Sequence, residues 1–442
     1  MEPRYRFAFF VDDHISHFYA HAGIAARLLG AGHAVRFYSP GKWQGTIAAA
    51  GFDSVADTLL DPSIISDQAP PATRAGWRAT VEIRAADICR GLPLLLGHYK
   101  PDLLIFDPFM LCFWPALRSL APAVSLSTKP LLTTDPLVPP YTSALVPADT
   151  PLGRLRVWSA CQRARIAYAR YRLRCTINEW KTGHSHRSLT LAIAKASGLD
   201  WKKEWRTRPY ALDLRFASVP ELVVHAAELE LPRLHALEGP GAYIGPCTDL
   251  PVITTPIDLP AGSRPFIFVS LGTVNLQHTD RLRKRYRAVL EAIADTKDWR
   301  AVIATSDEAT TALLAGCNPC PERVFIKTWV GRGEYLAEAD AVVNHGGSAS
   351  VKEAILAGRP MLVLPHRVDQ PGMAARVVFH GLGFMHRGAD SNRIKFLIAQ
   401  LLADAAYRHR VEAMRNIFKK YDDQQIAVSI LENAAAGQSP RF

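Results

Sequence analysis

Short apolar runs alternate with helix-like stretches along this chain, and the alternation occurs twice, on either side of a proline-rich segment. Apolar runs of three to six residues suit strands that are buried on both faces of a sheet. Strands that alternate with helices in sequence predict parallel sheets with crossover helices. We therefore expect an α/β protein. The predicted strands are Phe7–Val11, Ala34–Tyr38, Leu103–Phe106, Phe266–Leu271, Ala301–Ala304, Val324–Ile326, Ala341–Asn344 and Met361–Leu364.

The proline-rich segment, residues 246–265, marks the expected boundary between two domains. It holds five prolines and no helical periodicity, as an interdomain linker does. With 442 residues, the chain is longer than one compact core usually holds. Residues 1–245 form the predicted first domain and residues 266–420 the second. Residues 421–442 are predicted to form a carboxyl-terminal helix that packs back toward the first domain.

The location of the protein is predicted from two absences in the sequence. There is no run of about 20 apolar residues that would predict a membrane-spanning helix. The amino terminus lacks the long apolar stretch and the cleavage site of a signal peptide. A cytoplasmic protein is therefore expected.

The positive charge of the chain is concentrated in one segment. Residues 151–210 hold 14 basic and three acidic residues, so they account for the whole net charge of +11. The spacing from Arg163 to Ile177 predicts an amphipathic helix with cationic and apolar stripes. Such a face suits peripheral contact with the inner membrane surface, an anionic small molecule or plain solvent. Nucleic acid is not expected as a partner, because no recognition motif accompanies the charge.

The most informative stretch for chemistry runs from residue 340 to residue 383. It predicts a strand, a glycine-rich turn, a helix and a second strand. Glycines let backbone N–H groups approach a ligand closely. A helix that begins near Ser348 presents unpaired N–H donors and the positive end of its dipole. His345 and Ser350 add donors, and Glu353 is placed for ribose hydroxyls. The stretch therefore predicts a site for the phosphates of a nucleotide.

These residues resemble the donor-binding signature of the family-one, UDP-glycosyltransferase-like nucleotide-sugar glycosyltransferases. The resemblance implies the GT-B fold, in which two Rossmann-like domains with parallel sheets face an interdomain cleft. It also implies donor contacts from the turn after Phe266–Leu271, from a Trp-Val pair at the base, and from an Asp-Gln pair at the sugar. The donor-binding residues that it implies are Gly272, Thr273, Trp329, Val330, His345, Gly347, Ser348, Ser350, Glu353, Asp369 and Gln370.

One position departs from the family pattern. Where members often carry Pro-Gln after the Trp and one further residue, this chain carries Gly331 and Arg332. The departure leaves two predicted roles for Arg332, pairing with a phosphate or facing solvent. It also leaves the donor open between a UDP-sugar and a dTDP-sugar, with UDP-glucose as the leading expectation.

The first domain is expected to supply the catalytic base. The family places a His shortly after the first strand, and counting back from Gly32-His33 puts His17 at this position, with His14 as the alternative. An imidazole has an ordinary pKa of about 6.5, which suits proton transfer near neutral pH. The base is expected in a loop at the carboxyl end of the first strand, facing the cleft, and His17 fits this position. Asp107 follows a predicted strand and would orient His17 and stabilise the imidazolium. The alternative role for Asp107 is to cap the next turn.

The resemblance implies an inverting glycosyltransferase of the bacterial type that modifies small hydrophobic natural products or carotenoids, with a hexose such as glucose as the sugar. Phe109, Met110 and Phe113 are predicted to line the acceptor site, with core packing as the alternative. No metal or other cofactor is expected, because no Asp-x-Asp stands in a donor position and the one Cys-x-x-Cys, Cys317 to Cys320, has no second pair. Two alternative functions are a non-catalytic GT-B auxiliary protein and an isomerase of the nucleotide-sugar 2-epimerase type.

Overall fold

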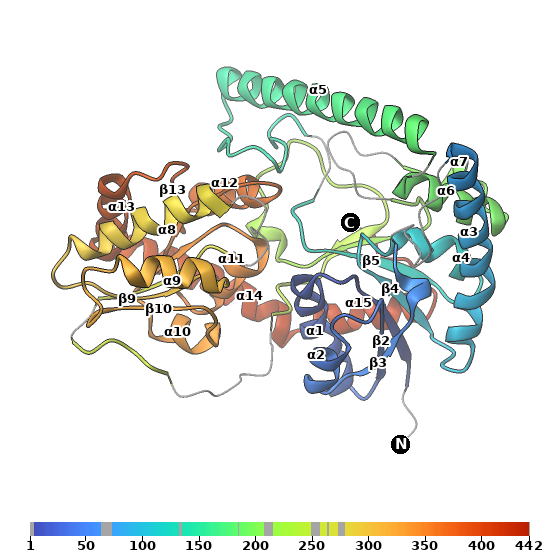
Figure 1. The fold of residues 1–442 in the computed structure, drawn as a ribbon, viewed down its shortest axis with the longest axis horizontal. Coiled ribbons are helices and arrows are strands. Elements are labelled where there is room, and N and C mark those ends of the chain that lie inside the picture. The colour runs from blue at the N-terminus through green and yellow to red at the C-terminus, as the bar shows by residue number, and fades with distance from the viewer. Residues whose placement is uncertain are drawn as a thin grey trace.

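The computed structural model describes residues 4–62, 73–131, 135–183, 185–206, 215–248, 257–262, 265–272 and 279–441. Two α/β domains lie side by side, and one long helix, α5, crosses over the top of the molecule (Figure 1). No helix in the described part of the chain is both long enough and apolar enough to cross a membrane.

The first domain is built on a seven-stranded parallel sheet with the strand order β3-β2-β1-β4-β5-β6-β7. Its strands are β1 (Arg6–Phe10), β2 (Ala34–Ser39), β3 (Asp53–Ala56), β4 (Leu103–Phe106), β5 (Ala123–Ser127), β6 (Glu221–Val223) and β7 (Gly241–Tyr243). Its helices are α1 (Ile15–Gly30), α2 (Gln44–Ala49), α3 (Arg74–Gly97), α4 (Trp114–Leu117), α5 (Pro151–Thr182), α6 (His186–Ala196) and α7 (Trp201–Glu204).

The second domain repeats this arrangement with a six-stranded parallel sheet in the order β10-β9-β8-β11-β12-β13. Its strands are β8 (Phe266–Ser270), β9 (Arg300–Ala304), β10 (Val324–Lys327), β11 (Ala341–Asn344), β12 (Met361–Val363) and β13 (Gly383–Met385). Its helices are α8 (Thr279–Ala294), α9 (Glu308–Gly316), α10 (Arg332–Glu338), α11 (Ser348–Leu356), α12 (Gln370–Phe379), α13 (Ser391–Ala403) and α14 (Ala405–Asp423); a last helix, α15 (Ile426–Ala435), follows.

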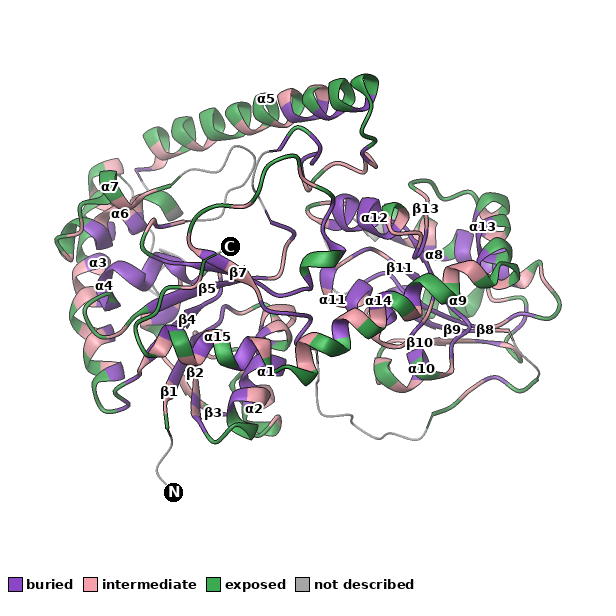
Figure 2. Ribbon diagram, turned by 180° about the vertical axis from the view of Figure 1, so that it is seen from behind, coloured by how far each residue is buried: buried purple, intermediate pink, exposed green. Residues whose placement is uncertain are grey.

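Each sheet is covered by helices on both faces, as the uninterrupted apolar strands predict. In β1, Phe7 and Phe9 point into the core beneath α1 and α15, whereas Ala8 and Phe10 point into the core beneath α3 and α6. Successive strand residues point to opposite faces of a sheet, so a strand between two helical layers must be apolar throughout. The buried strands at the centre of each domain are visible in Figure 2. The predicted α/β class is confirmed.

The end of the chain joins the two domains. Helix α14 belongs to the second domain, and α15 packs against the first, where Leu431 lies in the core beneath α1. Arg27 Nη2 lies 2.9 Å from Asp422 Oδ1, and His33 Nε2 lies 3.0 Å from Glu432 Oε1. The chain therefore crosses between the domains a second time, after the segment at 246–265.

Candidate functional site

In each sheet, successive strands are added first on one side of the initial strand and then on the other, so each sheet has one topological switch point. The predicted site residues follow the strands on either side of these two switch points. In the first sheet the switch point falls between β1 and β4, and in the second between β8 and β11. In open parallel sheets, ligands bind beyond the carboxyl ends of the strands at such points. Asp12 follows β1 and Asp107 follows β4, whereas Gly272 follows β8 and His345 follows β11.

His17 lies between two carboxylates in the first domain. Its Nδ1 is 3.0 Å from Asp12 Oδ1 and 3.2 Å from Asp107 Oδ2. Both acids are buried. With Nδ1 facing the carboxylates, Nε2 is the nitrogen that remains for a substrate proton.

The charges around His17 determine its protonation. Burial by itself would lower the pKa of the imidazole, but Asp107 and Asp12 outweigh it and raise the pKa to about 10. Burial likewise acts to raise the pKa of Asp107, and the neighbouring His17 holds it below its ordinary value. Without substrate, the cluster therefore contains an imidazolium between two carboxylates.

The surroundings of His17 differ from the sequence prediction in two respects. The prediction placed His17 in a loop, but it lies in the first turn of α1. Asp12 was not predicted as a partner, although its oxygen is nearer to His17 than that of Asp107. The signal was present in the sequence, because an acid directly after the first strand must lie at the carboxyl end of the sheet.

The alternative candidate, His14, has a different position. Its Nδ1 is bonded to Asp12 Oδ2 at 2.7 Å, and its side chain is largely exposed. Asp12, His14 and His17 each place one ligand atom within 4.8 Å of the others, as a metal ion would require. The predicted absence of a metal stays a prediction, and this cluster is one place where a metal ion could bind.

The three residues predicted to line the acceptor site lie in two different environments in the structure. The ring of Phe109 is stacked on His17, with centroids 5.2 Å apart and planes at 16°, and 43% of this residue is exposed. Met110 and Phe113 are fully buried in the core beneath α3 and α6. The prediction that they line the acceptor site is therefore wrong for this structure, and core packing, the alternative, accounts for both.

In the second domain, the ring of His345 lies between two glycines. A Cβ on Gly347 would lie 2.5 Å from His345 Nε2, and a Cβ on Gly272 would lie 2.7 Å from it. Gly272 also has a φ of +89°, which other residues rarely adopt. The imidazole thus takes the space that side chains would fill. Burial first, and Arg332 second, lower the pKa of His345 to about 4, so the ring is neutral and acts as a hydrogen-bond partner rather than a charge.

The amino terminus of α11 has the features that the sequence predicted. The turn before it is held by Asn344, whose Oδ1 accepts a hydrogen bond from Gly346 N at 2.8 Å. Gly347 provides no side-chain cap, and the buried Ser348 Oγ has no hydrogen-bond partner in the described part of the chain. Unpaired donors at a helix amino terminus suit a phosphate. Ser350 lies in the first turn of the helix and is half-buried, and Thr273 lies outside the described residues.

Arg332 does not simply face solvent. Its Nη2 lies 3.2 Å from Glu353 Oε1, so it pairs with the residue predicted to bind the ribose. Its pairing with a phosphate stays a prediction. Burial raises the pKa of Glu353, and Arg332 opposes this. Trp329 is 66% exposed, and Val330 packs against the core.

The Asp-Gln pair lies at the start of α12. Gln370 is buried, and its Oε1 accepts hydrogen bonds from the backbone N–H of His366 at 2.8 Å and of Arg367 at 3.1 Å. Its amide oxygen thus fixes the turn after β12. Asp369 stands beside it, half-buried, as the residue before α12.

Comparison with known proteins identifies relatives of this chain. Residues 287–425 match the family model of the erythromycin biosynthesis protein CIII-like, C-terminal domain. The chain is 33% identical over 176 residues to the zeaxanthin glucosyltransferase of Pseudescherichia vulneris, which covers 40% of this chain and 41% of the relative. It is 25% identical over 193 residues to the demethyllactenocin mycarosyltransferase of Streptomyces fradiae, which covers 43% and 40%. The matched segments thus span about two fifths of these relatives.

Solved structures match over almost the whole chain. The crystal structure of the glycotransferase of kitacinnamycin superposes with a TM-score of 0.66 at 19% identity, covering 98% of this chain and 100% of that one. This similarity confirms the GT-B fold. Together with the family model and the relatives above, it confirms the predicted resemblance to family-one glycosyltransferases.

Proposed function

We propose that this chain, a GT-B protein related to the family-one glycosyltransferases, transfers a sugar from a nucleoside-diphosphate sugar to a hydroxyl of a small hydrophobic acceptor. The observation that carries the proposal is the pairing of two sites in one molecule. His17, held by two carboxylates, lies at the switch point of the first sheet, and His345 with the start of α11 lies at that of the second. UDP-glucose is the donor that we propose first and a dTDP-sugar second.

The proposed reaction inverts the sugar centre. In the deprotonated form of His17, Nε2 takes the proton of the acceptor hydroxyl, and the resulting oxygen nucleophile attacks C1 of the donor from the face opposite the diphosphate. The bond between C1 and the diphosphate oxygen breaks, and a nucleoside diphosphate leaves. Asp12 and Asp107 stabilise the imidazolium that forms, because both lie within 3.2 Å of Nδ1.

The proposed donor site acts without a metal. The N–H groups at the start of α11, the Ser348 hydroxyl, which no described residue pairs with, and the neutral His345 ring supply hydrogen bonds where negative charge develops on the leaving diphosphate. Trp329 stacks on the base, and Glu353 binds the ribose after exchanging its contact with Arg332. Asp369 and the Gln370 NH₂ group bind sugar hydroxyls.

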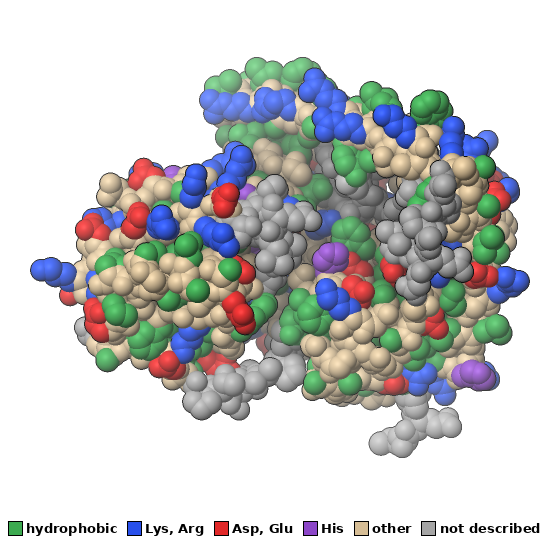
Figure 3. Space-filling model, viewed as in Figure 1, with side chains coloured by type: hydrophobic (Ala, Val, Ile, Leu, Met, Phe, Trp, Pro, Cys, Tyr) green, Lys and Arg blue, Asp and Glu red, His purple; other side chains and the backbone are tan. Residues whose placement is uncertain are grey.

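The proposed acceptor is hydrophobic because the ring of Phe109 forms the exposed wall beside His17. The surface between the two domains is recessed beneath α5 (Figure 3). A hydrophobic acceptor dissolves in a bilayer. We therefore propose that the protein is cytoplasmic and contacts the inner membrane surface peripherally through residues 151–210.

A thermal-shift panel with UDP, dTDP, GDP and ADP tests the donor site. A ligand at about 100 times its dissociation constant stabilises the folded state by about 2.7 kcal/mol. We expect UDP or dTDP to raise the melting temperature by a few degrees, with and without a chelator. No shift with any nucleotide would contradict the proposal, and a shift lost on chelation would contradict metal independence.

A pair of glycine variants assigns that shift to its site. Gly347→Ala introduces a Cβ 2.5 Å from His345 Nε2 and should displace the ring, so the nucleotide shift should fall by more than half. Gly316→Ala is the matched control, because a Cβ there meets nothing within 4 Å. Equal shifts in the two variants would place nucleotide binding elsewhere.

The pH dependence of kcat/KM tests the base. Since the pKa of His17 is raised to about 10, the active deprotonated form grows with pH, and kcat/KM should climb from neutral into the alkaline range. Asp12→Asn should move the midpoint of this rise down by about 1 to 3 pH units, because one stabilising charge is lost. Asp13→Asn is the control and should leave it in place. The same midpoint in the Asp12 and Asp13 variants would rule out this role of Asp12.

The same pKa links pH to stability. Because folding raises the pKa of His17, the folded state binds a proton that the unfolded state releases more readily. This contribution to the free energy of unfolding is full below about pH 6.5, the ordinary His value, and is lost as the pH rises through the folded pKa of about 10.

A further inference from the structure

Helix α5 carries a row of large apolar side chains that face away from the protein. Leu155, Ile166, Leu173, Ile177 and Trp180 follow one another at intervals of 11, 7, 4 and 3 residues, which are close to whole turns of an α-helix. Each is between 44% and 64% exposed. The residues of α5 that are buried, Gly153, Val157, Ala160 and Cys161, lie on the opposite side of the helix and near its start. Almost the whole second half of α5 is exposed, as Figure 2 shows.

Arginines border this apolar row on both sides. Arg154, Arg165 and Arg172 repeat at the same intervals of 11 and 7 residues as Leu155, Ile166 and Leu173, one position earlier, so they run parallel to the row. On the other side lie Arg156, Arg163, Arg170, Arg174 and Lys181. Glu179 is the one acid on α5. Blue and green side chains accordingly alternate along the helix in Figure 3.

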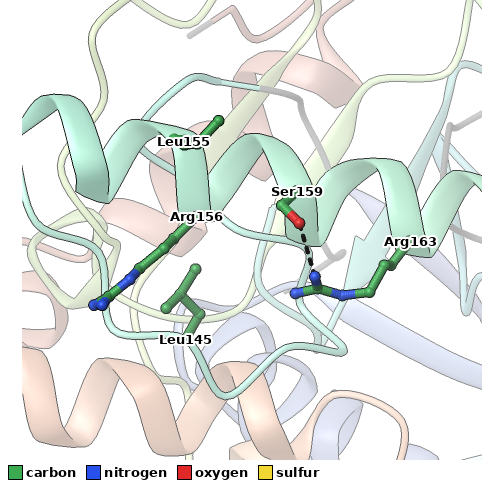
Figure 4. Close-up of a pocket in the computed structure, with 5 residues that line it drawn as sticks. All are labelled: Leu145, Leu155, Arg156, Ser159 and Arg163. Carbon is green, nitrogen blue, oxygen red and sulfur yellow. Dashed lines mark hydrogen bonds between the residues drawn. The ribbon is translucent and has the colours of Figure 1, made fainter.

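A hollow beside α5 combines the same two chemistries. It has a volume of about 440 Å³ and is lined by Leu145, Leu155, Arg156, Ser159 and Arg163 (Figure 4). Arg163 Nη1 donates a hydrogen bond to Ser159 Oγ at 2.7 Å, which holds the guanidinium on this side of the helix. The two leucines suit the part of a lipid acyl chain next to the headgroup, and the two guanidinium groups suit the lipid phosphate.

We propose that α5 is a membrane-docking helix that lies flat on a bilayer containing anionic phospholipid, with its apolar row among the acyl chains and its two arginine rows at the lipid phosphates. A helix of 32 residues is about 48 Å long, and its charge and exposed apolar residues match an interfacial helix. Long arginine side chains reach from such a helix to the phosphate level.

The pattern favours a bilayer over other partners. A strand of nucleic acid would be bound through charge and stacking, and it gives no reason for exposed Leu and Ile residues along one face of the helix. A second copy of this chain would bring two arginine-bordered rows together, with like charges opposed. An anionic bilayer satisfies both features at once, because each basic residue near its surface contributes about fivefold to binding.

Vesicle sedimentation with the full chain tests the proposal. We expect binding to vesicles of phosphatidylcholine with 30% phosphatidylglycerol, weaker binding in 0.5 M salt, and no binding to pure phosphatidylcholine. Arg165→Glu with Arg172→Glu should lower the partition coefficient at least about 25-fold, because two basic residues are lost. Ile166→Glu with Leu173→Glu should also abolish binding. Glu is a good helix former, so both variants should keep α5 helical.

The matched control is Lys419→Glu with Lys420→Glu, which changes the net charge equally on α14. It should bind within about twofold of the natural chain, because charges further than about 8 Å from the surface are screened at physiological salt. Failure of the natural chain to bind the anionic vesicles would overturn the proposal, as would equal losses in all three variants. A dimer that only the Ile166 and Leu173 variant abolishes, without vesicle binding, would show an interface between copies instead. None of these outcomes depends on transferase activity, and the nucleotide thermal shift of each variant checks its folding.

Discussion

Replacing His17 by alanine is expected to lower the rate of sugar transfer by roughly 10²–10⁴-fold, the usual contribution of a general base. The reason is geometric: in the described part of the chain, His17 is the imidazole held between the carboxylates of Asp12 and Asp107. Nucleotide binding should be unchanged, because the donor residues lie in the other domain. Transfer to a panel of hydrophobic alcohols and phenols, measured as release of nucleoside diphosphate, gives the rate.

His14→Ala is the matched control for this experiment. It removes the same chemical group from the same cluster, but the His14 side chain is largely exposed and contacts Asp12 alone among the acids. We expect its rate to stay within about tenfold of the natural chain. Equal losses in both variants would indicate that the two histidines act together, for example as ligands of one metal ion, and adding or chelating Zn²⁺ would then change the rate.

The same variant separates the proposed function from its alternatives. An auxiliary protein needs no base, so His17→Ala should leave its effect on a partner enzyme intact. An isomerase would convert the nucleotide-sugar without any acceptor, whereas a transferase needs one. Nucleotide binding together with acceptor-dependent turnover that His17→Ala abolishes would exclude both.

Replacing Glu230 by alanine is expected to have the largest effect on stability. Glu230 Oε2 accepts a hydrogen bond from Arg376 Nε at 3.1 Å and pairs with Arg376 Nη2, and Oε1 accepts one from Leu131 N at 2.9 Å. Arg376 is 1% exposed. Removing one partner of a buried ion pair leaves the other charge without compensation and costs about 3–5 kcal/mol of unfolding free energy. Urea denaturation measures this loss.

Two comparisons make the stability experiment specific. Asp87→Ala removes an exposed ion pair with Arg90 and should change the unfolding free energy by about 1 kcal/mol or less. A double variant, Glu230→Ala with Arg376→Met, should be more stable than Glu230→Ala alone, because no unpaired charge remains. If Glu230→Ala lost no more unfolding free energy than Asp87→Ala, the predicted effect of this buried ion pair would be wrong.

The acid dependence of stability follows from the same pair. Burial by itself would raise the pKa of Glu230, but Arg376 and His225 outweigh it and lower the pKa to about 2. A lowered folded-state pKa contributes stability above the unfolded value, about 4.5, that is lost as the pH falls toward 2. The Glu230→Ala variant should lack this part of the acid transition.

The contacts between the domains could not be predicted from the sequence. Lys352 lies inside the predicted donor helix, and its buried Nζ donates hydrogen bonds to Val224 O and Pro246 O, both at 2.8 Å. Burial lowers the pKa of this ammonium to about 8. Lys352 and Arg376 look like ordinary helix-surface cations in the sequence, because nothing local shows that the other domain covers them.

The two parallel sheets and the glycine-rich turn before α11 could be predicted from the sequence alone, because strand burial, glycine turns and helix starts depend on local residue order. The spacing favoured His17 over His14 as the base but placed it in a loop rather than in α1. The tertiary structure alone decided which groups meet. It placed Asp12 at His17, paired Arg332 with Glu353, buried Met110 and Phe113, and turned the apolar row of α5 outward. The physical reason is that contact distance, desolvation and burial depend on how elements pack, and packing joins residues that are far apart in the chain.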